Sequence, residues 1–371
     1  MIGRVIIKNF KAFRECEIKF SKLTIIMGEN GIGKSTIVQS ILLSKQALVG
    51  STEIPKNLYL NGPLVKIGNG ADALRKNAEE EKIAVSIELM DGLLFEWSAA
   101  YVPGSDVLPM TVGDVSGIQS FRDSRIRYLS AERVGPQLTS PFSQSEASRS
   151  DIDERGANAL GLLHFSSDMA LDSDDPRVPS EAKSRSIQSI FNYYLSKISS
   201  GATVAVQDLS DIDSVSATFS FVLQGELPME RIRPTNVGFG LSYSASIIIM
   251  CLISKPGETI IIENPEAHLH TKGLRAILDL LVLTAEAGVQ VICESHSREI
   301  LYWTRRKVIE SQVPSDLAIV NYVCSTDGHA DKVVVPWYPL SKPLYELGPA
   351  AEDFLEHFGA PLDFQQLPTA S

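Results

Sequence analysis

Two short stretches of the sequence carry residue types that could handle a phosphorylated ligand. The first, GENGIGKST, begins at Gly28 and fits the pattern G-x-x-x-x-G-K-[ST] with Gly33, Lys34 and Ser35. Glycines let the backbone approach an anion closely, so that consecutive N–H groups can surround it. The lysine can reach the β- and γ-phosphates, and the serine hydroxyl can ligate Mg²⁺. This stretch therefore predicts binding of a nucleoside triphosphate together with Mg²⁺.

The position of this stretch in the chain supports the same interpretation. It follows the apolar run LTIIM, typical of a buried strand, and precedes TIVQSILL, in which apolar residues recur at helical spacing. A phosphate loop needs this context, because the dipole at a helix N-terminus favours an anion. The nucleotide contacts are expected at Gly28, Asn30, Gly31, Gly33, Lys34, Ser35 and Thr36.

The second stretch, TIIIENPEAHLH, ends a buried strand with acidic and polar residues. Glu263 is expected to hold Mg²⁺ together with Ser35, directly or through water. The next residue, Asn264, stands where a P-loop ATPase usually has the glutamate that activates water. An amide can orient water but cannot take its proton. Hydrolysis is therefore predicted either to be slow or to use a carboxylate elsewhere.

Three side chains could take the place of the missing base. Glu266 comes two residues after Asn264, although it could instead cap the next turn. His296, in the later segment VQVICESHS, suits a contact with the γ-phosphate better than the role of base. Glu294 lies two residues before His296, hence on the same face if the strand continues that far. Our hypothesis is that Glu294 supplies the carboxylate; the alternative is slow hydrolysis without a dedicated base.

Composition limits the kinds of partner. The 371 residues carry a net charge of −11, with a pI near 5.1. That charge argues against broad wrapping of duplex DNA, whereas a local basic patch for nucleic acid stays open. Four cysteines without CxxC spacing indicate reduced thiols. The N-terminus lacks a signal peptide's apolar core, and the longest apolar run is too short for a membrane helix. We expect a cytoplasmic protein with no membrane partner.

Alternating strands and helices must position these residues. Strands followed by amphipathic helices predict a largely parallel sheet, and early strand pairs predict an antiparallel lobe beside it. One pair is joined by Asp91-Gly92, a strong hairpin signal. TVAVQDL and SVSATFSFVLQ predict another hairpin. Two polar, Ser-rich stretches, 140–155 and 171–186, are expected to be mobile loops on either side of a short helix at ANALGLLHF.

The fold class is therefore α/β, and we divide the chain into four parts. Residues 1–104 are expected to form the N-terminal half of the nucleotide-binding core, with its phosphate loop and antiparallel lobe. Residues 105–230 are expected to be an inserted lobe with polar loops. Residues 231–335 would complete the core, and residues 336–371 would form a C-terminal tail.

The order of the motifs resembles the ABC class of ATPases, in its RecF/SMC/OLD-like branch. IKNFKAF precedes the phosphate loop, NVGFGLSYSAS opens an apolar helix, TIIIENPEAHLH is the Walker B strand, and VQVICESHS holds the switch histidine. The blocks YLSAERVGP, NVGFG and ENPEAHLH resemble most closely small bacterial AAA ATPases with a C-terminal domain of unknown function. The resemblance fades after Arg305. In such folds the VQVICESHS strand neighbours the Walker B strand, so Glu294 is expected beside Glu263 and Asn264.

The resemblance implies a P-loop ABC-type ATPase head: a mixed, mostly parallel sheet with helices on both faces, an antiparallel β lobe, and a helical and loop insertion. It also implies a homodimer or higher homo-oligomer that holds ATP between protomers. Each site would pair one chain's phosphate loop with the other chain's signature loop, here Gly238, Gly240 and Ser242. Tyr243 and Ser244 replace the glycines of a transporter signature. The alternative is a plain N-cap, with Ser242 starting a core helix.

The predicted function is an ATP-driven switch or scaffold for a separate effector, a nuclease or toxin, in bacterial DNA metabolism or anti-phage defence. The resemblance alone supplies this biological setting. The alternatives are a self-contained ATP-dependent nuclease and a RecF-like DNA-binding ATPase of DNA repair. Few residues follow His296 for the metal-binding domain that such nucleases append. No heptad arms indicate a chromosome clamp, and no LSGGQ-like loop indicates a transporter subunit.

Overall fold

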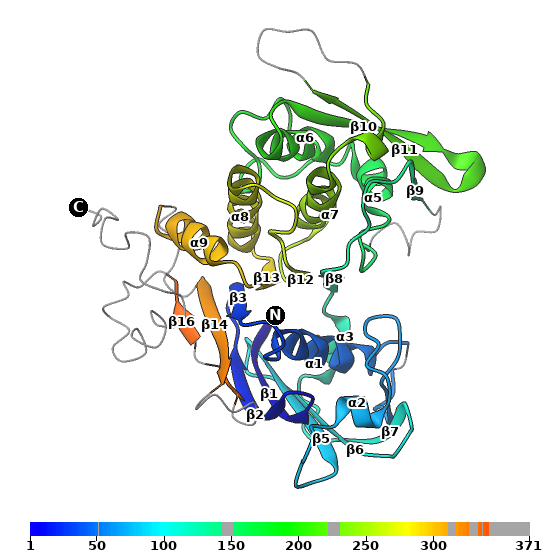
Figure 1. Ribbon diagram of the computed structural model, residues 1–371, viewed down its shortest axis with the longest axis vertical. Coiled ribbons are helices and arrows are strands. Elements are labelled where there is room, and N and C mark those ends of the chain that lie inside the picture. The colour runs from blue at the N-terminus through cyan, green and yellow to red at the C-terminus, as the bar shows by residue number, and fades with distance from the viewer. Residues whose placement is uncertain are drawn as a thin grey trace.

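The computed structural model describes residues 1–50, 52–142, 151–221, 231–310, 317–325, 333–335 and 337–340. A seven-stranded sheet lies at its centre, and five of its strands run parallel although they come from distant parts of the chain (Figure 1). In spatial order these five are β14 (Ala318–Ser325), β3 (Leu23–Gly28), β13 (Gln290–Glu294), β12 (Thr259–Glu263) and β8 (Ile126–Leu129). The short strands β15 (Val333–Val334) and β16 (Trp337–Pro339) pair antiparallel with β14. The mixed, mostly parallel sheet is confirmed.

The parallel strands are apolar almost throughout because helices cover both faces of the sheet. In β12, Ile260 and Ile262 pack into one hydrophobic core and Ile261 into the other. On the first face lie α7 (Phe239–Ile253), α8 (Thr271–Glu286) and α9 (Arg298–Glu310), and on the second lies α1 (Lys34–Gln46) (Figure 1). Because successive side chains of a strand point to opposite faces, each strand contributes residues to both hydrophobic cores.

A six-stranded antiparallel sheet forms the expected lobe beside this core (Figure 1). Its strands, in spatial order, are β2 (Phe13–Lys19), β1 (Ile2–Phe10), β5 (Lys82–Leu89), β6 (Leu94–Ala100), β7 (Val107–Val112) and β4 (Asn57–Tyr59). The Asp91-Gly92 hairpin is confirmed, since β5 pairs with β6 and Gly92 has φ 83°. Two short helices, α2 (Gly70–Ala73) and α3 (Ile118–Asp123), accompany this sheet.

A third, small sheet joins β10 (Ala202–Leu209), β11 (Ser214–Phe221) and β9 (Thr139–Pro141). The predicted β10–β11 hairpin and the predicted short helix, α5 (Ala159–Ser166), are confirmed, and α6 (Ile187–Ile198) follows them. Residues 105–230 contribute strands to all three sheets: β7 to the lobe, β8 to the central sheet and β9 to β11 to the small one. The division of the chain into four parts stays a prediction.

The loop expected to be mobile at 171–186 is anchored at its centre. Arg177 is buried, and its Nη1 donates to the carbonyl oxygens of Cys251 and Ser254, each at 2.7 Å. Asp175 accepts two hydrogen bonds from the same guanidinium, at 2.9 and 2.6 Å. Buried charge needs such compensation, so this loop is fixed to the C-terminal end of α7. The other expected loop lies partly outside the described residues, at 143–150.

Among the described helices, none combines the length and the apolar character that a bilayer crossing requires. Of the tail at 336–371, the structure describes only residues 337–340.

Candidate nucleotide site

The phosphate loop leaves β3 at Gly28 and enters α1 at Lys34, as the sequence predicts. Gly28, Gly31 and Gly33 have φ values of 147°, 79° and 119°, a region that L side chains rarely adopt. A Cβ on Gly28 would overlap the carbonyl oxygen of Val323, and one on Gly33 would meet Ala12 at 2.9 Å. Backbone conformation and crowding thus both require glycine where the loop turns.

Lys34 is turned back onto its own loop. Its Nζ donates to the carbonyl oxygens of Gly28 at 2.9 Å and Glu29 at 2.7 Å. Burial lowers the pKa of Lys34, while Glu294 and Glu266 raise it. The ammonium group must exchange these two carbonyls for phosphate oxygens when a nucleotide binds.

Glu294 reaches the phosphate loop directly. The Ser35 hydroxyl donates to Oε1 of Glu294 at 3.0 Å, because β13 lies between β3 and β12 in the sheet. Glu294 pairs in register with Glu263, as expected. Burial, reinforced by Glu263, raises the pKa of Glu294 to about 7, against the opposing effects of the Ser35 hydrogen bond and of Lys34. The carboxylate of the neighbouring strand is thus nearest to the hydroxyl that can ligate Mg²⁺.

Glu263 is held from its other side, by β8 and the segment that follows it. The Tyr128 hydroxyl donates to its Oε1 at 3.0 Å, and the Ala131 N–H donates to its Oε2 at 3.1 Å. Both carboxylate oxygens of Glu263 are therefore fixed before any ligand enters, and the group is oriented by β8 rather than by the phosphate loop.

The turn after β12 orients Glu266 toward the switch histidine. Asn264 has φ 44°, and its N–H donates to the carbonyl oxygen of Glu294 at 2.8 Å. Glu266 accepts a hydrogen bond from the Ser295 hydroxyl at 2.6 Å, and the same Oε1 lies 3.7 Å from Nδ1 of His296. The two sequence candidates Glu266 and His296 thus form a pair, separate from the Ser35–Glu294 pair.

The acids at this sheet edge fit a divalent cation that also binds phosphate. Oε2 of Glu294 and Oε2 of Glu266 are buried without a hydrogen-bond partner among the described residues. In the same part of the chain, no three His, Cys, Asp or Glu side chains group closely enough to hold a metal by themselves. Mg²⁺ usually takes one or two carboxylates, and phosphates and water complete its shell. Ser35, Glu294 and Glu263 are the residues that would hold it.

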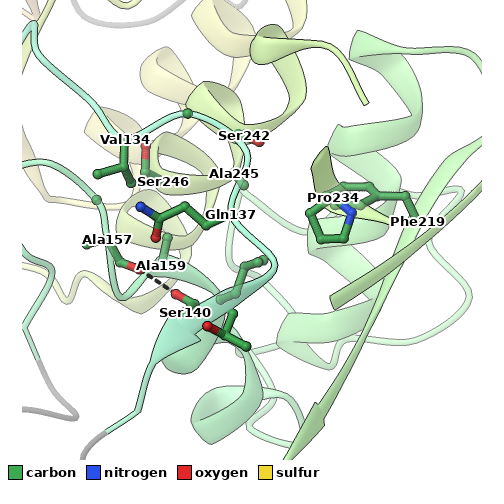
Figure 2. A pocket seen from close by; sticks show the side chains of 14 residues that line it. Val134, Gln137, Ser140, Ala157, Ala159, Phe219, Pro234, Ser242, Ala245 and Ser246 are labelled. Carbon is green, nitrogen blue, oxygen red and sulfur yellow. Dashed lines mark hydrogen bonds between the residues drawn. The ribbon is translucent and has the colours of Figure 1, made fainter. Parts of the chain in front are cut away.

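The signature helix α7 begins earlier than expected, at Phe239, with Gly238 as its N-cap. The expectation that the core helix starts at Ser242 is therefore wrong, whereas the choice between a plain N-cap and a signature loop stays a prediction. Phe239 is 53% exposed, whereas Ser242 lines a cavity of about 40 Å³ between α7 and the segment after β8 (Figure 2). A Cβ on Gly240 would lie 2.6 Å from the carbonyl oxygen of His268, so this turn packs tightly on the turn after β12.

Sequence reasoning missed the residues that hold the Walker B strand in place. Tyr128, Ala131 and Arg133 all belong to YLSAERVGP, a block noted only as a family marker. The available signal was weak, because the block begins inside β8, a short strand, IRYL, that contains a charged residue. Parallel pairing of β8 with β12 brings the block to the same sheet edge as Glu263.

Sequence and structure comparisons agree with this geometry. Residues 1–92 match a family described as an AAA ATPase domain. The crystal structure of an Smc head bound to the C-winged helix domain of ScpA aligns with a TM-score of 0.55 and 16% identity, over 93% of this chain and 99% of that one. An Smc head domain with an extended coiled coil, bound to the C-terminal domain of ScpA from Pyrococcus furiosus, aligns with a TM-score of 0.54 and 16% identity, over 93% and 98%.

These likenesses in structure establish the fold alone. No curated protein matches the chain in sequence. Residues 113–301, more than half of the chain, match the family described as "AAA domain, putative AbiEii toxin, Type IV TA system". The chain therefore belongs to this family of AAA domains, with the fold of an SMC head.

Proposed function

We propose that the protein is a Mg²⁺-dependent ATPase in which the acids at the sheet edge have separate tasks. The hydrogen bond from Ser35 to Glu294 carries this proposal. A carboxylate that accepts a hydrogen bond from the Mg²⁺-ligating hydroxyl is placed to bind the metal ion. Ser35, Glu294 and Glu263 would hold the ion. When bound, Mg²⁺ neutralises charge on the phosphate oxygens.

The water-activating group is then Glu266 rather than Glu294. Its carboxylate is oriented by Ser295 and lies beside His296, the residue in the switch position. A general base must lie within hydrogen-bond reach of water that attacks the γ-phosphate. Oε2 of Glu266, which has no partner among the described residues, is free to accept that proton.

Steady-state phosphate release by Glu266→Gln and Glu294→Gln tests this assignment. Loss of a general base typically costs 10²–10⁴-fold in rate, so kcat of Glu266→Gln should fall by at least about 10²-fold with ATP and Mg²⁺ affinities retained. Glu294→Gln should instead require more Mg²⁺, by roughly tenfold, and should recover turnover at high Mg²⁺. Loss of turnover in Glu294→Gln at saturating Mg²⁺, with Glu266→Gln active, would reverse the two roles.

We further propose that two copies sandwich ATP and that the assembly controls a separate effector. The exposed first turn of α7, at Gly238 and Phe239, presents a helix N-terminus suited to a phosphate held by another copy. The similar Smc heads are bound to domains of a separate protein, ScpA, and the family description names a toxin–antitoxin system. A toxin or nuclease encoded separately is the effector that these likenesses favour.

Co-purification tests the second part. Glu266→Gln, trapped with ATP, should retain an effector that wild type releases after hydrolysis. If the trapped protein is recovered as a dimer with no other protein bound, the ATP-driven dimer stands but the separate effector is ruled out.

A further inference from the structure

Arg133 is a buried guanidinium between two parts of the site that are far apart in the sequence. Its side chain is 3% exposed. Burial lowers the pKa of Arg133 to about 10, and Glu266 is the strongest opposing influence, so the group stays charged at neutral pH. A charge is kept in such a place only where hydrogen bonds and counter-charges compensate it. The partners of Arg133 therefore indicate what the residue does.

Its first contacts fix the turn after the Walker B strand. Nη1 donates to the carbonyl oxygen of Asn264 at 3.3 Å, and Nη2 donates to that of Glu263. These carbonyls flank a residue in the left-handed region, at φ 44°. Bonding both of them holds the turn that aims Glu266 at His296.

Its other contact reaches the signature helix. The guanidinium carbon lies 5.8 Å from the ring centroid of Tyr243 in α7, within the range of a cation–π interaction. Tyr243 in turn packs edge-on against His268, at 4.8 Å between centroids. Arg133 thus links the signature helix to the Walker B turn through one charged side chain, in addition to the direct contact of Tyr243 with His268.

We propose that Arg133 is a positioning residue that couples the signature helix to the Walker B turn, so that phosphate contact at the first turn of α7 orients Glu266 for hydrolysis. The inference rests on the proposed ATPase function. Arg133 does not touch the nucleotide; it acts through the carbonyls of Glu263 and Asn264 and through the ring of Tyr243.

Turnover by Arg133→Met and Arg133→Lys tests this role, with Arg177→Met as the matched control. Arg177 has the same 3% exposure and also bonds backbone carbonyls, but at the opposite end of α7. A misplaced catalytic group can cost about 10²-fold. We expect Arg133→Met to lose about that much kcat with ATP affinity changed less than about threefold, and Arg133→Lys to recover part of it. Equal losses of kcat in both methionine variants would show a purely structural role.

A double-mutant cycle with Tyr243→Leu isolates the coupling. If the two side chains act together, the variant that carries Arg133→Met and Tyr243→Leu should turn over no more slowly than Arg133→Met alone. Multiplicative losses in kcat would overturn the coupling, because the residues would then act independently.

Hydrogen exchange provides a readout that needs no hydrolysis. With Mg²⁺ and a non-hydrolysable ATP analogue, wild type should gain protection at residues 28–36 and also at 239–246. Arg133→Met should keep the protection at residues 28–36 and lose the protection at residues 239–246. If the variant is protected at both segments, the inference is overturned, although nucleotide binding is then still supported. Absence of protection at 28–36 in wild type would instead overturn the proposed function, and this inference with it.

Discussion

At the scale of single residues, backbone conformation accounts for the asparagine that follows the Walker B glutamate. Asn264 has φ 44°, and asparagine is among the few non-glycine residues that tolerate this region. A glutamate there would be strained by roughly 1–2 kcal/mol. Such strain would disfavour this turn, and the turn is what directs Glu266 to Ser295 and His296. One turn conformation thus accounts both for asparagine at position 264 and for the orientation of Glu266, the base that we propose.

The raised pKa of Glu294 makes the stability of the ligand-free protein depend on pH. A carboxyl whose folded pKa of about 7 exceeds its usual 4.5 stabilises the fold fully below pH 4.5. That contribution is lost as pH rises to 7, on the order of 3 kcal/mol at most. Glu294→Gln has no carboxyl to ionise here and so does not lose stability as the pH rises. In the presence of EDTA its melting temperature should therefore exceed that of wild type at pH 8 and match it near pH 5. Equal melting temperatures at pH 8 would contradict the prediction.

The glycines of the phosphate loop differ in what they tolerate. Gly28→Ala places a methyl group on the carbonyl of Val323, whereas a Cβ at Gly31 meets nothing within 4 Å. Gly31→Ala should therefore cost only the strain of its positive φ, roughly 1–2 kcal/mol, and Gly28→Ala should cost more. Urea unfolding of the two variants compares them directly; a smaller loss for Gly28→Ala would contradict the structural explanation.

At the scale of elements, anchors far from the chemistry fix both ends of α7. Its N-terminal turn packs on the turn after β12, and its C-terminal carbonyls are bonded by Arg177 from the loop at 171–186. Tyr194 of α6 donates to the carbonyl oxygen of Arg177 at 3.1 Å, which ties the loop to a second helix. The loop is thus tied to the C-terminal end of α7 and to α6, away from the signature turn.

Removal of the counter-ion in this loop should be costly. Asp175→Ala leaves the buried Arg177 without its carboxylate, which typically costs about 3–5 kcal/mol. The Arg177 hydrogen bonds hold the pKa of Asp175 below its usual value despite burial, so the pair stabilises the fold above pH 3.8 and loses this effect as pH falls further. Glu79→Ala, which removes an exposed partner of Arg14, should cost under about 1 kcal/mol. Chemical denaturation at pH 7 measures both; similar losses would refute the argument.

At the scale of the whole molecule, the parallel sheet presents its phosphate loop, acids and switch histidine along one edge. Such an arrangement follows from parallel strands, whose carboxyl ends meet at the same edge of a sheet. The signature turn packs on the turn after β12 and carries an exposed aromatic ring, Phe239, and this surface is the one we expect a second copy to cover.

Substitution of this ring tests the dimer. Phe239→Ser should abolish ATP-dependent dimerisation of Glu266→Gln, because it removes exposed apolar surface at the expected interface. Ile212→Ser is the matched control, since Ile212 is 63% exposed but lies beside the small sheet. Light scattering after size-exclusion chromatography reads the mass. Dimers that form equally with Phe239→Ser would place the interface elsewhere.

The sequence by itself determined the phosphate loop, the Walker B strand and most helices and strands. Each depends on a local pattern: glycine spacing before a helix, alternation in a strand, or Asp91-Gly92 in a hairpin. Local periodicity also placed Glu294 and His296 on one strand face on the condition that the strand continues, but β13 ends at Glu294 and that condition is not met.

Only the tertiary structure decided which acid meets which partner. The order β3–β13–β12 places Glu294 on Ser35, although 259 positions separate them in the chain. The pairing of β8 with β12 brings Arg133 and Tyr128 to Glu263. Strand order and side-chain packing between distant segments leave no trace in local periodicity, because they depend on which hydrophobic faces are buried together. The division of work that we propose for the carboxylates is based on that packing.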